Sequence, residues 1–562
     1  MPTGRDLFSK EEVDMKERVF QILEEIVAIR SVSCSVTEQD AARWFADFFQ
    51  AMPYFQKHPE DTGLYEIPND PYGRLLPYAF LKGEKADTVV LSGHFDVVST
   101  EEYGAAEEYA YQIGNSTLEE MLREMPLTEQ QRADLDSGEW IWGRGVADMK
   151  GGVAIHAALF EEYAKQAVAG ELEGSLLFIP VCDEESYSAG MRSALTLMRM
   201  FKEKYDLDYK LLIDPEPTVE QDGKLTLSLG SAGKIMPAVL VQTKKAHGGH
   251  CYEGFSALNV ISDICLRTNG SLAFSDVYKD EATVPPTWAN LRDMKPGYDV
   301  SIPHRAYGYF TVFCFDSTPD MVMEKLRKVC TDAFAAQADK LDQEFQLYRK
   351  MNKADSTAKP VFTPCVVTFR ELCGMAREKD PEGFEAFYKE TYAQLSDAIA
   401  AGSTNYPDAT IAFMEKVLDF TDIQYPITVI GIAPPYYPPV HSDMMPGREG
   451  FGSKVYEYVN QVSQRDFGRE IVTENYFMGL SDLSYSGITA PFDYEKFALD
   501  TPLFGDSYNI DFDTMELLSI PGIIYGPIGR EYHMYTERVL KKSLLEEVPQ
   551  TTRSLIEYVW SL

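Results

Sequence analysis

The sequence lacks long hydrophobic runs and is short of basic residues, and each shortage excludes a class of protein. No window in the 562 residues reaches the roughly 18 consecutive apolar residues of a transmembrane helix. Lysine and arginine number 52 against 88 aspartates and glutamates, which gives a formal net charge of −36. Nucleic acids and anionic membranes repel such a polyanion. We therefore expect neither as a partner, whereas a cationic ligand suits the charge.

Cysteine is also sparse, and the eight cysteines include no C-x-x-C pair. This distribution is typical of reduced, mostly buried thiols and not of a disulfide framework. The amino-terminal residues lack the apolar core of a signal peptide. We therefore expect a cytoplasmic protein.

The composition, 45% hydrophobic and 25% charged, allows a full globular core and two or more domains. Continuous apolar runs occur at 88–93, 176–181 and 209–214, with helical patterns between them. Continuous runs are typical of strands that are covered on both faces. The alternation predicts an α/β fold with a central, mostly parallel sheet flanked by helices.

The pattern changes after about residue 230, where a compact strand-helix-strand-helix set predicts a smaller α+β domain. The chain then turns helical and acidic before further buried-strand runs appear near the carboxyl terminus. We expect a catalytic domain whose second part resumes after the insertion. The expected parts are 1–231, an inserted domain at 232–344, and 345–562 with a helical insertion at about 345–425.

Chemically active residues follow the predicted strands. The first run ends in H-F-D, where His94 is a good zinc ligand and Asp96, two residues on, can orient it. Asp148 lies in G-R-G-V-A-D-M-K-G-G, at the start of a helix. Taken alone, a histidine of this kind is more often structural, and the aspartate is more often a helix N-cap.

Further acids follow the next two runs: Glu184 and Glu185 in C-D-E-E-S, and Asp214 in L-I-D-P-E-P. A single acid at a strand end is normally solvated. Because ligands bind outside the carboxyl ends of strands in α/β sheets, however, these side chains should converge. Carboxylates with too few nearby cations are readily held by divalent metal ions, and mixed histidine and carboxylate donors suit zinc, cobalt or manganese.

In this order, the H-x-D, D-M-K-G-G and D-E-E blocks resemble the co-catalytic zinc peptidase family of glutamate carboxypeptidase, aminoacylase and succinyl-diaminopimelate desuccinylase. A late G-P-I-G-R-E-Y-H, ending at His533, is similar to that family's last ligand motif. The resemblance implies two divalent ions, most often zinc. It implies these roles: His94 and Asp214 on one ion, Glu185 and His533 on the other, Asp148 bridging, Glu184 as general base, and Asp96 orienting His94.

The inserted domain resembles the ferredoxin-like lid of this family, through which members can form homodimers. Its segment K-K-A-H-G-G-H matches the one whose histidine contacts the scissile carbonyl. The resemblance assigns that role to His247, with His250 as the competing choice.

The chain length, the helical insertion and P-P-Y-Y-P-P-V-H-S-D resemble a longer subgroup that includes the bacterial arginine-utilisation protein RocB. His441 lies in that last segment, and we expect a structural or substrate-rim role for it. Many relatives have an arginine two residues after the aspartate that matches Asp316, whereas this chain has Thr318. Arg305 is the candidate to bind a substrate carboxylate instead.

These features together predict a metal-dependent hydrolase that cleaves an amide bond of an N-acylated amino acid or short peptide, in arginine catabolism. One alternative is an aminopeptidase of the related di-zinc family. Another is a non-enzymatic regulator that binds a metal or an amino acid. The presence of Glu184 argues against the regulator, because a chain that no longer catalyses need not keep its base.

Overall fold

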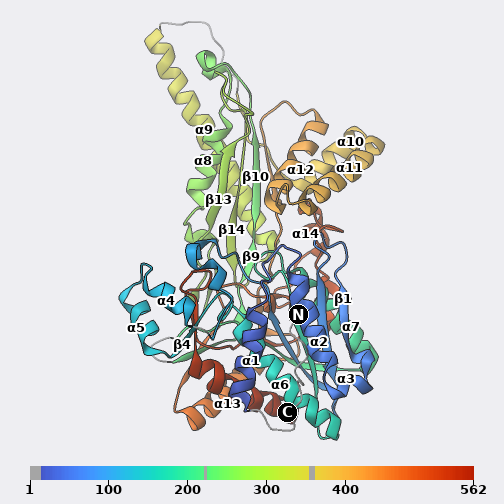
Figure 1. Ribbon diagram of the computed structural model, residues 1–562. Helices are drawn as coiled ribbons and strands as arrows, with labels where there is room; N and C mark the ends of the chain where they lie inside the picture. The colour runs from blue at the N-terminus through green and yellow to red at the C-terminus, as the bar shows by residue number, and fades with distance from the viewer. Residues whose placement is uncertain (1–13, 115, 221–223, 353–360) are drawn as a thin grey trace. The chain divides into compact units, whose positions relative to one another are not determined.

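The computed structural model describes residues 14–114, 116–220, 224–352 and 361–562 (Figure 1). Within these ranges, no helix combines the length and apolar character that a membrane crossing requires.

The chain divides into two compact units. Unit 1 comprises Met1–Ser231, Val440–Thr489 and Asp511–Leu562, and unit 2 comprises Ala232–Pro439 and Ala490–Ile510. The first boundary coincides with the expected one. The point at which the chain returns to unit 1 differs from the expected one, because the helical stretch after 345 and the strand at 427–432 belong to unit 2.

Unit 1 is built on an eight-stranded sheet with the order β1-β2-β5-β3-β6-β19-β7-β18. Its strands are β1 Thr62–Glu66, β2 Leu75–Leu81, β3 Asp87–His94, β5 Ser175–Val181, β6 Asp208–Asp214, β7 Leu225–Ser228, β18 Ile471–Glu474 and β19 Gly522–Ile524. Smaller pairings involve β4 Trp140–Trp142, β8 Gly230–Ser231, β17 Val440–His441, β20 Gly529–Arg530 and β21 Arg538–Leu540. The three apolar runs form β3, β5 and β6, which are adjacent and parallel. The predicted α/β fold is confirmed.

The helices of unit 1 are α1 Met15–Val27, α2 Glu38–Gln50, α3 Pro53–Lys57, α4 Thr117–Arg123, α5 Glu129–Ser137, α6 Lys150–Ala169, α7 Ala189–Tyr205, α13 Phe451–Phe467, α15 Phe512–Leu518 and α16 Val548–Ser561. Helix α6 packs on β3 and β5 and against α1, while α7 packs on β2 and β5 and against α15. Every residue of β5 is buried, which explains its unbroken apolar sequence.

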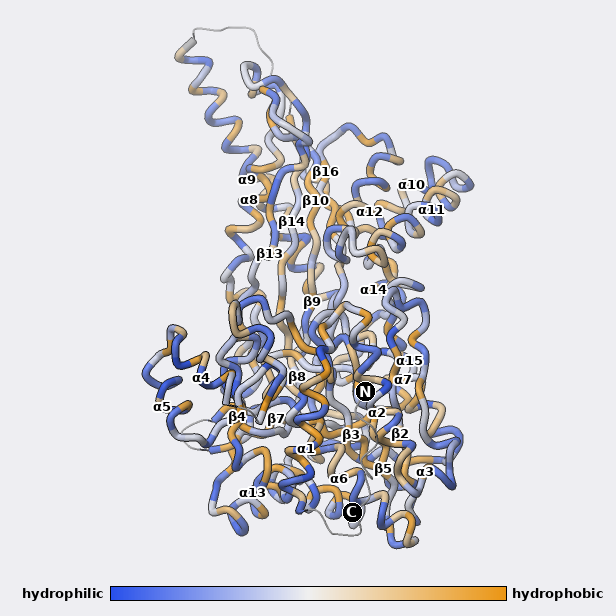
Figure 2. Tube along the Cα trace, in the orientation of Figure 1, coloured by the Kyte–Doolittle hydropathy of each residue, from blue (hydrophilic) through white to orange (hydrophobic). Residues whose placement is uncertain are grey.

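Unit 2 has its own sheet, with β13-β14-β10-β16-β15 as its main path. The strands of this sheet are β9 Gly233–Ile235, β10 Pro237–Gln242, β13 Thr287–Asp293, β14 Arg305–Cys314, β15 Val366–Thr368 and β16 Ile427–Ile432, while β11 Val277–Tyr278 and β12 Glu281–Ala282 form a separate pair. Strand β16 pairs with β10 along its whole length, which is why this run does not return to unit 1. Figure 2 colours β10 and β16 mainly hydrophobic, as central strands require.

The helices of unit 2 form two groups. They are α8 Ala257–Thr268, α9 Pro319–Asn352, α10 Phe369–Lys379, α11 Pro381–Ala400, α12 Tyr406–Thr421 and α14 Tyr494–Asp500. Helices α8 and α9 pack together along the sheet, whereas α10, α11 and α12 form a separate cluster (Figure 1). Helix α12 joins that cluster to the sheet through β10 and β16.

The two glycines of D-M-K-G-G bring the start of α6 against neighbouring backbone. A Cβ added at Gly151 would lie 2.3 Å from the carbonyl oxygen of Val146, and one added at Gly152 would lie 2.2 Å from that of Pro215. No side chain fits at either position without moving backbone. The motif therefore holds the segment that contains Asp148 close to the end of β6.

We predict that Gly152→Ala destabilises the protein by about 1–3 kcal/mol, because the new methyl group overpacks against backbone. Gly374→Ala in α10 is the matched control, since a Cβ there meets nothing within 4 Å. The control should be neutral or slightly stabilising, because alanine is the better helix former. Urea unfolding of both variants measures the difference, and equal stabilities would contradict the prediction.

Candidate metal centre

His94 is the last residue of β3, and both nitrogens of its buried imidazole are engaged. Nδ1 lies 3.0 Å from the backbone oxygen of Asp96, and Nε2 lies 3.1 Å from Oδ1 of Asp148. Burial lowers the pKa of His94, but hydrogen bonds with Asp148 and Asp96 outweigh it and hold the pKa well above its ordinary value. In the neutral tautomer whose Nδ1–H donates to this carbonyl, Nε2 has a free lone pair on the side of the carboxylates. A metal-binding histidine presents its lone pair in this way, toward a cation that the carboxylates also bind.

Asp148 holds its carboxylate between two imidazoles. Oδ1 lies 3.1 Å from Nε2 of His94, and Oδ2 lies 3.4 Å from Nε2 of His533. Burial raises the pKa of Asp148, but hydrogen bonds with His533 and His94 bring it below the usual range. A carboxylate that directs one oxygen toward each of two ligand groups has the geometry to bridge two cations.

Glu184 and Glu185 face different imidazoles although they are adjacent. Asp183 has φ 68°, so the chain turns immediately after β5. Oε2 of Glu184 then lies 3.8 Å from Nε2 of His94, while Oε2 of Glu185 lies 2.9 Å from Nε2 of His533. The turn therefore places one glutamate on each side of the cluster.

Asp96 connects His94 to this turn. Its Oδ1 lies 3.6 Å from Nδ1 of His94, and its carboxylate accepts the backbone N–H groups of Glu184 and Glu185 at 3.2 and 3.3 Å. Burial raises the pKa of Asp96, but the hydrogen bond with His94 and that from Ser33 lower it overall. Asp96 thus positions an imidazole and two backbone amides at once.

The structure brings Glu216, which the sequence analysis did not select, into the cluster. Oε1 of Glu216 lies 3.7 Å from Nε2 of His94, and donor atoms of Glu216, Glu184 and His94 all lie within 4.8 Å of one another. Asp214 belongs to no such group among the described residues. Its Oδ2 instead accepts a hydrogen bond from the hydroxyl of Ser481.

One signal in the sequence pointed to Glu216. In extended chain, residues two apart point to the same side, so the spacing in L-I-D-P-E-P admits either Asp214 or Glu216. Burial raises the pKa of both carboxyls, that of Asp214 to about 6 and that of Glu216 well above its ordinary value. Glu216 is therefore a carboxylate that needs a cation and faces the cluster.

His533 completes the cluster from the segment between β20 and β21. Its side chain is half-exposed, and Nε2 lies 2.9 Å from Glu185 and 3.4 Å from Asp148. Hydrogen bonds with Asp148 and Glu185 raise the pKa of His533 to about 10.

Glu537, four residues after His533, supports the centre without joining it. One carboxylate oxygen accepts the backbone N–H groups of Ala147 and Asp148 at 3.1 and 3.2 Å, and the other pairs with buried Arg144 at 2.7 Å. Burial raises the pKa of Glu537 to about 7. The late motif therefore holds the backbone of the D-M-K-G-G segment.

The charge balance of the cluster fits divalent cations. Among the described residues, seven largely buried carboxylates lie around two imidazoles: Asp96, Asp148, Glu184, Glu185, Asp214, Glu216 and Asp482. Burial is the main cause that raises the pKa values of Glu184, Glu185 and Asp482, the last to about 8, and neighbouring carboxylates add to it. Groups of this kind normally require cations to stay ionised. The mixed nitrogen and oxygen donors match zinc, cobalt or manganese.

A cavity of about 480 Å³ opens beside the cluster, wholly within unit 1. Asp148, Glu184, Glu185, Glu216 and His533 contribute to its wall. The rest of the wall is mainly apolar but includes Tyr532 and Glu474, which the sequence analysis did not identify. The volume suits a small substrate.

The expected lid histidines lie in unit 2. Nδ1 of His247 accepts the N–H of Gly249 at 3.0 Å, at the start of the 3-10 helix Gly248–Glu253. Nδ1 of His250 lies 3.3 Å from the carboxylate of Glu253. Their assignment to the scissile carbonyl stays a prediction.

Arg305 and His441 both have local structural partners. The guanidinium of Arg305 binds Gln242 at 2.7 Å, Glu415 at 3.1 Å and Asp419 at 2.6 Å, which fastens β14 to α12. His441 is fully buried, and its Nδ1 accepts the N–H of Asp443 at 3.2 Å. These contacts favour structural roles for both residues.

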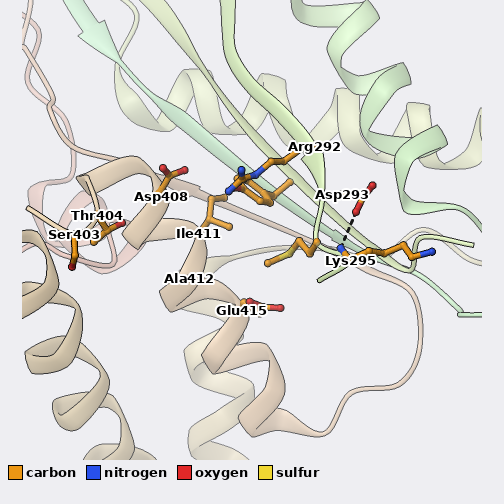
Figure 3. A pocket seen from close by; sticks show the side chains of 11 residues that line it. Arg292, Asp293, Lys295, Ser403, Thr404, Asp408, Ile411, Ala412 and Glu415 are labelled. Atoms are coloured by element: carbon orange, nitrogen blue, oxygen red, sulfur yellow. Dashed lines mark hydrogen bonds between the residues drawn. The ribbon is translucent and has the colours of Figure 1, made fainter. Parts of the chain in front are cut away.

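A larger cavity, about 690 Å³, lies entirely within unit 2 between the end of β13 and α12. Figure 3 shows Arg292 on the strand side, facing Asp408 and Ile411. Its lining contains no histidine, and its carboxylates already have partners: Asp408 accepts from Tyr309 at 3.3 Å. The metal-type chemistry therefore belongs to the smaller cavity in unit 1.

Comparison with known proteins supplies the family. The sequence profile described as Peptidase family M20/M25/M40 matches residues 90–494, more than half of the chain. The chain belongs to this peptidase family. The resemblance seen in the sequence is therefore confirmed.

This M20 chain is 27% identical to the uncharacterized protein YqjN of Bacillus subtilis over 542 residues, which covers 95% of each protein. It is 25% identical to protein RocB of the same organism over 556 residues, 96% of this chain and 95% of RocB. The structure of aminopeptidase PepT from Bacillus cereus is similar with a TM-score of 0.52 and 13% identity, and the match covers 97% of this chain and 98% of PepT. That likeness shows a shared fold.

We predict that Glu216→Gln lowers the number of divalent ions this M20 protein retains from two toward one, because a neutral amide is a poorer ligand. Asp214→Asn should retain more metal than Glu216→Gln, since Oδ2 of Asp214 accepts from Ser481 and Glu216, not Asp214, belongs to a metal-type group with His94 among the described residues. Elemental analysis after dialysis without chelator measures both variants. Metal loss from Asp214→Asn alone would return the ligand role to Asp214.

Proposed function

We propose that the protein is a hydrolase that cleaves an amide bond of an N-acylated amino acid or short peptide with the help of two divalent ions. The observation that carries the proposal is the carboxylate of Asp148 between two imidazoles, 3.1 Å from His94 and 3.4 Å from His533. A glutamate accompanies each imidazole on the cavity wall. This arrangement supplies matched ligand sets on both sides of one bridging group.

The proposed ligand assignment differs from the expected one at a single residue. His94 and Glu216 would hold one ion, Glu185 and His533 would hold the other, and Asp148 would be a ligand to both. Asp214 moves from ligand to support in this assignment, because its Oδ2 accepts a hydrogen bond from Ser481 and it belongs to no metal-type group among the described residues. Zinc, cobalt and manganese all suit these donors.

The ions supply Lewis acidity, which polarises an amide carbonyl and lowers the pKa of water. The residues of the chain do the rest. Glu184 is not a ligand in this assignment and lies on the cavity wall, so it accepts the proton of the attacking water and delivers it to the leaving nitrogen. The carboxylate of Asp96 positions Glu184 by accepting the backbone N–H of Glu184. In unit 2, His247 is the proposed contact to the scissile carbonyl, with His250 as the alternative.

Glu184→Gln should keep both ions and still bind substrate, yet lose rate by at least the roughly 10² to 10⁴ that general acid–base catalysis provides. Glu185→Gln should instead weaken the binding of one ion, because the carboxylate of Glu185 faces His533. Metal content and single-turnover rates of the two variants separate these effects. If Glu184→Gln loses metal while Glu185→Gln keeps it, the two roles are exchanged.

A substrate screen distinguishes this function from the two alternatives. With zinc, cobalt or manganese added, we expect hydrolysis of N-acyl amino acids or dipeptides that does not require a free amino terminus. A strict requirement for a free amino terminus would favour the aminopeptidase. Saturable binding of amino acids without turnover would favour a regulator. A role in arginine catabolism is suggested by the likeness to RocB. The screen tests it when N-acylated arginine and N-acylated ornithine are among the substrates.

A further inference from the structure

A buried arginine, Arg74, contacts the turn that carries Glu184 and Glu185 without belonging to the metal centre. Arg74 directly precedes β2, which pairs antiparallel with β5. The same register, continued past the end of β5, brings Arg74 opposite Asp183, where the turn begins. Strand pairing therefore delivers a guanidinium to the start of the turn, and the mechanism proposed above gives it no role.

The guanidinium of Arg74 is engaged along two of its edges. Nη1 binds Oδ1 of Asp183 and lies 3.4 Å from Oε2 of Glu38. Nε and Nη2 bind Oδ1 of Asp70 at 2.9 and 2.6 Å. All four side chains are buried. A planar guanidinium can bind carboxylates in this way, whereas a lysine ammonium presents a single point charge.

The contacts around Arg74 converge on Asp183. Oε1 of Glu38 accepts the backbone N–H of Asp183 at 2.9 Å. Oδ2 of Asp183 accepts the N–H of Ala189, the first residue of α7, at 3.1 Å. The next two N–H groups of the turn bind Asp96. Asp183 thus connects the two ends of the turn, and Arg74 fixes its carboxylate.

The two glutamates of this turn should depend on it to different degrees. Glu185 lies 2.9 Å from His533 and, as a proposed ligand, would also be held by an ion. Glu184 is not a ligand in the proposed assignment, and its Oε2 lies 3.8 Å from Nε2 of His94. A shift of the turn should therefore displace the base while the ions stay bound. Misplacing a reacting group by about 1 Å can cost on the order of 10²-fold in rate.

We propose that Arg74 is a positioning residue that acts through Asp183 to hold the turn after β5, so that Glu184 meets the attacking water. The inference rests on the proposed hydrolase function and adds to it a residue outside the metal centre. Since Arg74 touches neither ligand nor substrate in this arrangement, its loss should slow the chemical step and leave the binding of metal and substrate nearly unchanged.

Kinetics and metal content of Arg74 variants test the proposal in the full-length, metal-replete chain. The probe is the N-acetyl amino acid or dipeptide that the wild type hydrolyses fastest in the substrate screen. We expect Arg74→Gln to lower kcat by about 10- to 100-fold, with KM within about threefold of wild type and both ions retained. Arg74→Lys keeps the charge and should recover part of the rate. A wild-type kcat, or a loss of rate that follows a loss of metal, would overturn the inference; if Arg74→Gln does not fold, Arg74→Lys decides by the same criteria.

Arg18→Gln is the matched control. Arg18 in α1 pairs at 2.6 Å with the buried carboxylate of Glu161 in α6, and neither residue belongs to the turn. This variant also leaves a buried carboxylate without its arginine, so it should lower stability but not kcat. Equal losses of kcat in Arg18→Gln and Arg74→Gln would indicate general destabilisation and overturn the inference.

A double-mutant cycle with Asp183→Asn tests the route. If Arg74 acts through Asp183, Arg74→Gln should lower kcat much less in the Asp183→Asn background than in the wild type. The neutral amide also removes the buried charge that Arg74→Gln would leave unpaired, which favours folding of the double variant. Equal fold-losses in the two backgrounds would overturn the inference.

A crystal structure of a metal-loaded Arg74 variant separates failure of the inference from failure of the proposed function. We expect the carboxylate of Glu184 to move away from His94, while Glu185 stays beside His533. If the wild type is active and Glu184 does not move in the variant, the inference fails and the hydrolase function stands. If the metal-replete wild type hydrolyses no probe but Glu184 moves, the hydrolase function fails while the positioning role of Arg74 in the turn stands.

Discussion

The carboxylate of Asp148 between two imidazoles is the interaction on which the rest of unit 1 depends. Its two oxygens face the imidazoles of His94 and His533, and hydrogen bonds with them bring its pKa below the usual range although burial raises it. The surrounding glutamates have the opposite shift, because burial and neighbouring charges raise the pKa values of Glu184 and Glu216. The opposite pKa shifts of Asp148 and the glutamates indicate that the cluster has too little positive charge. Divalent ions supply two charges in the volume of one atom.

The segments that supply these ligands are far apart in the sequence, and two acids outside the ligand set hold them together. Asp96 accepts two backbone N–H groups from the turn that contains Glu184, and Glu537 accepts two from the segment that contains Asp148. Each therefore fixes the backbone of a different motif. The aspartate of H-x-D and the glutamate after His533 thus act on neighbouring motifs more than on their own.

Much of the fold and most of the cluster could be predicted from the sequence, because continuous apolar runs mark buried strands and their ends mark the site. The partner of a strand could not be predicted in the same way. The run at 427–432 is as apolar as β5, and only its pairing with β10 assigns it to unit 2. Glu216 was missed for a related reason: the sequence offers two acids at one strand end, and only their contacts separate them. Glu474 gave no signal, since one glutamate at the end of an edge strand resembles solvated surface.

Three adjacent acids after β5 coexist because each faces a different basic side chain. Asp183 binds Arg74, which is buried with it, whereas Glu184 faces His94 and Glu185 faces His533. The left-handed turn at Asp183 makes this division possible, since extended chain would point Asp183 and Glu185 to the same side. Asp183 has a buried arginine partner, which it shares with Glu38 and Asp70. The two glutamates face imidazoles that other carboxylates share, and burial raises the pKa values of both. Their position therefore favours bound metal.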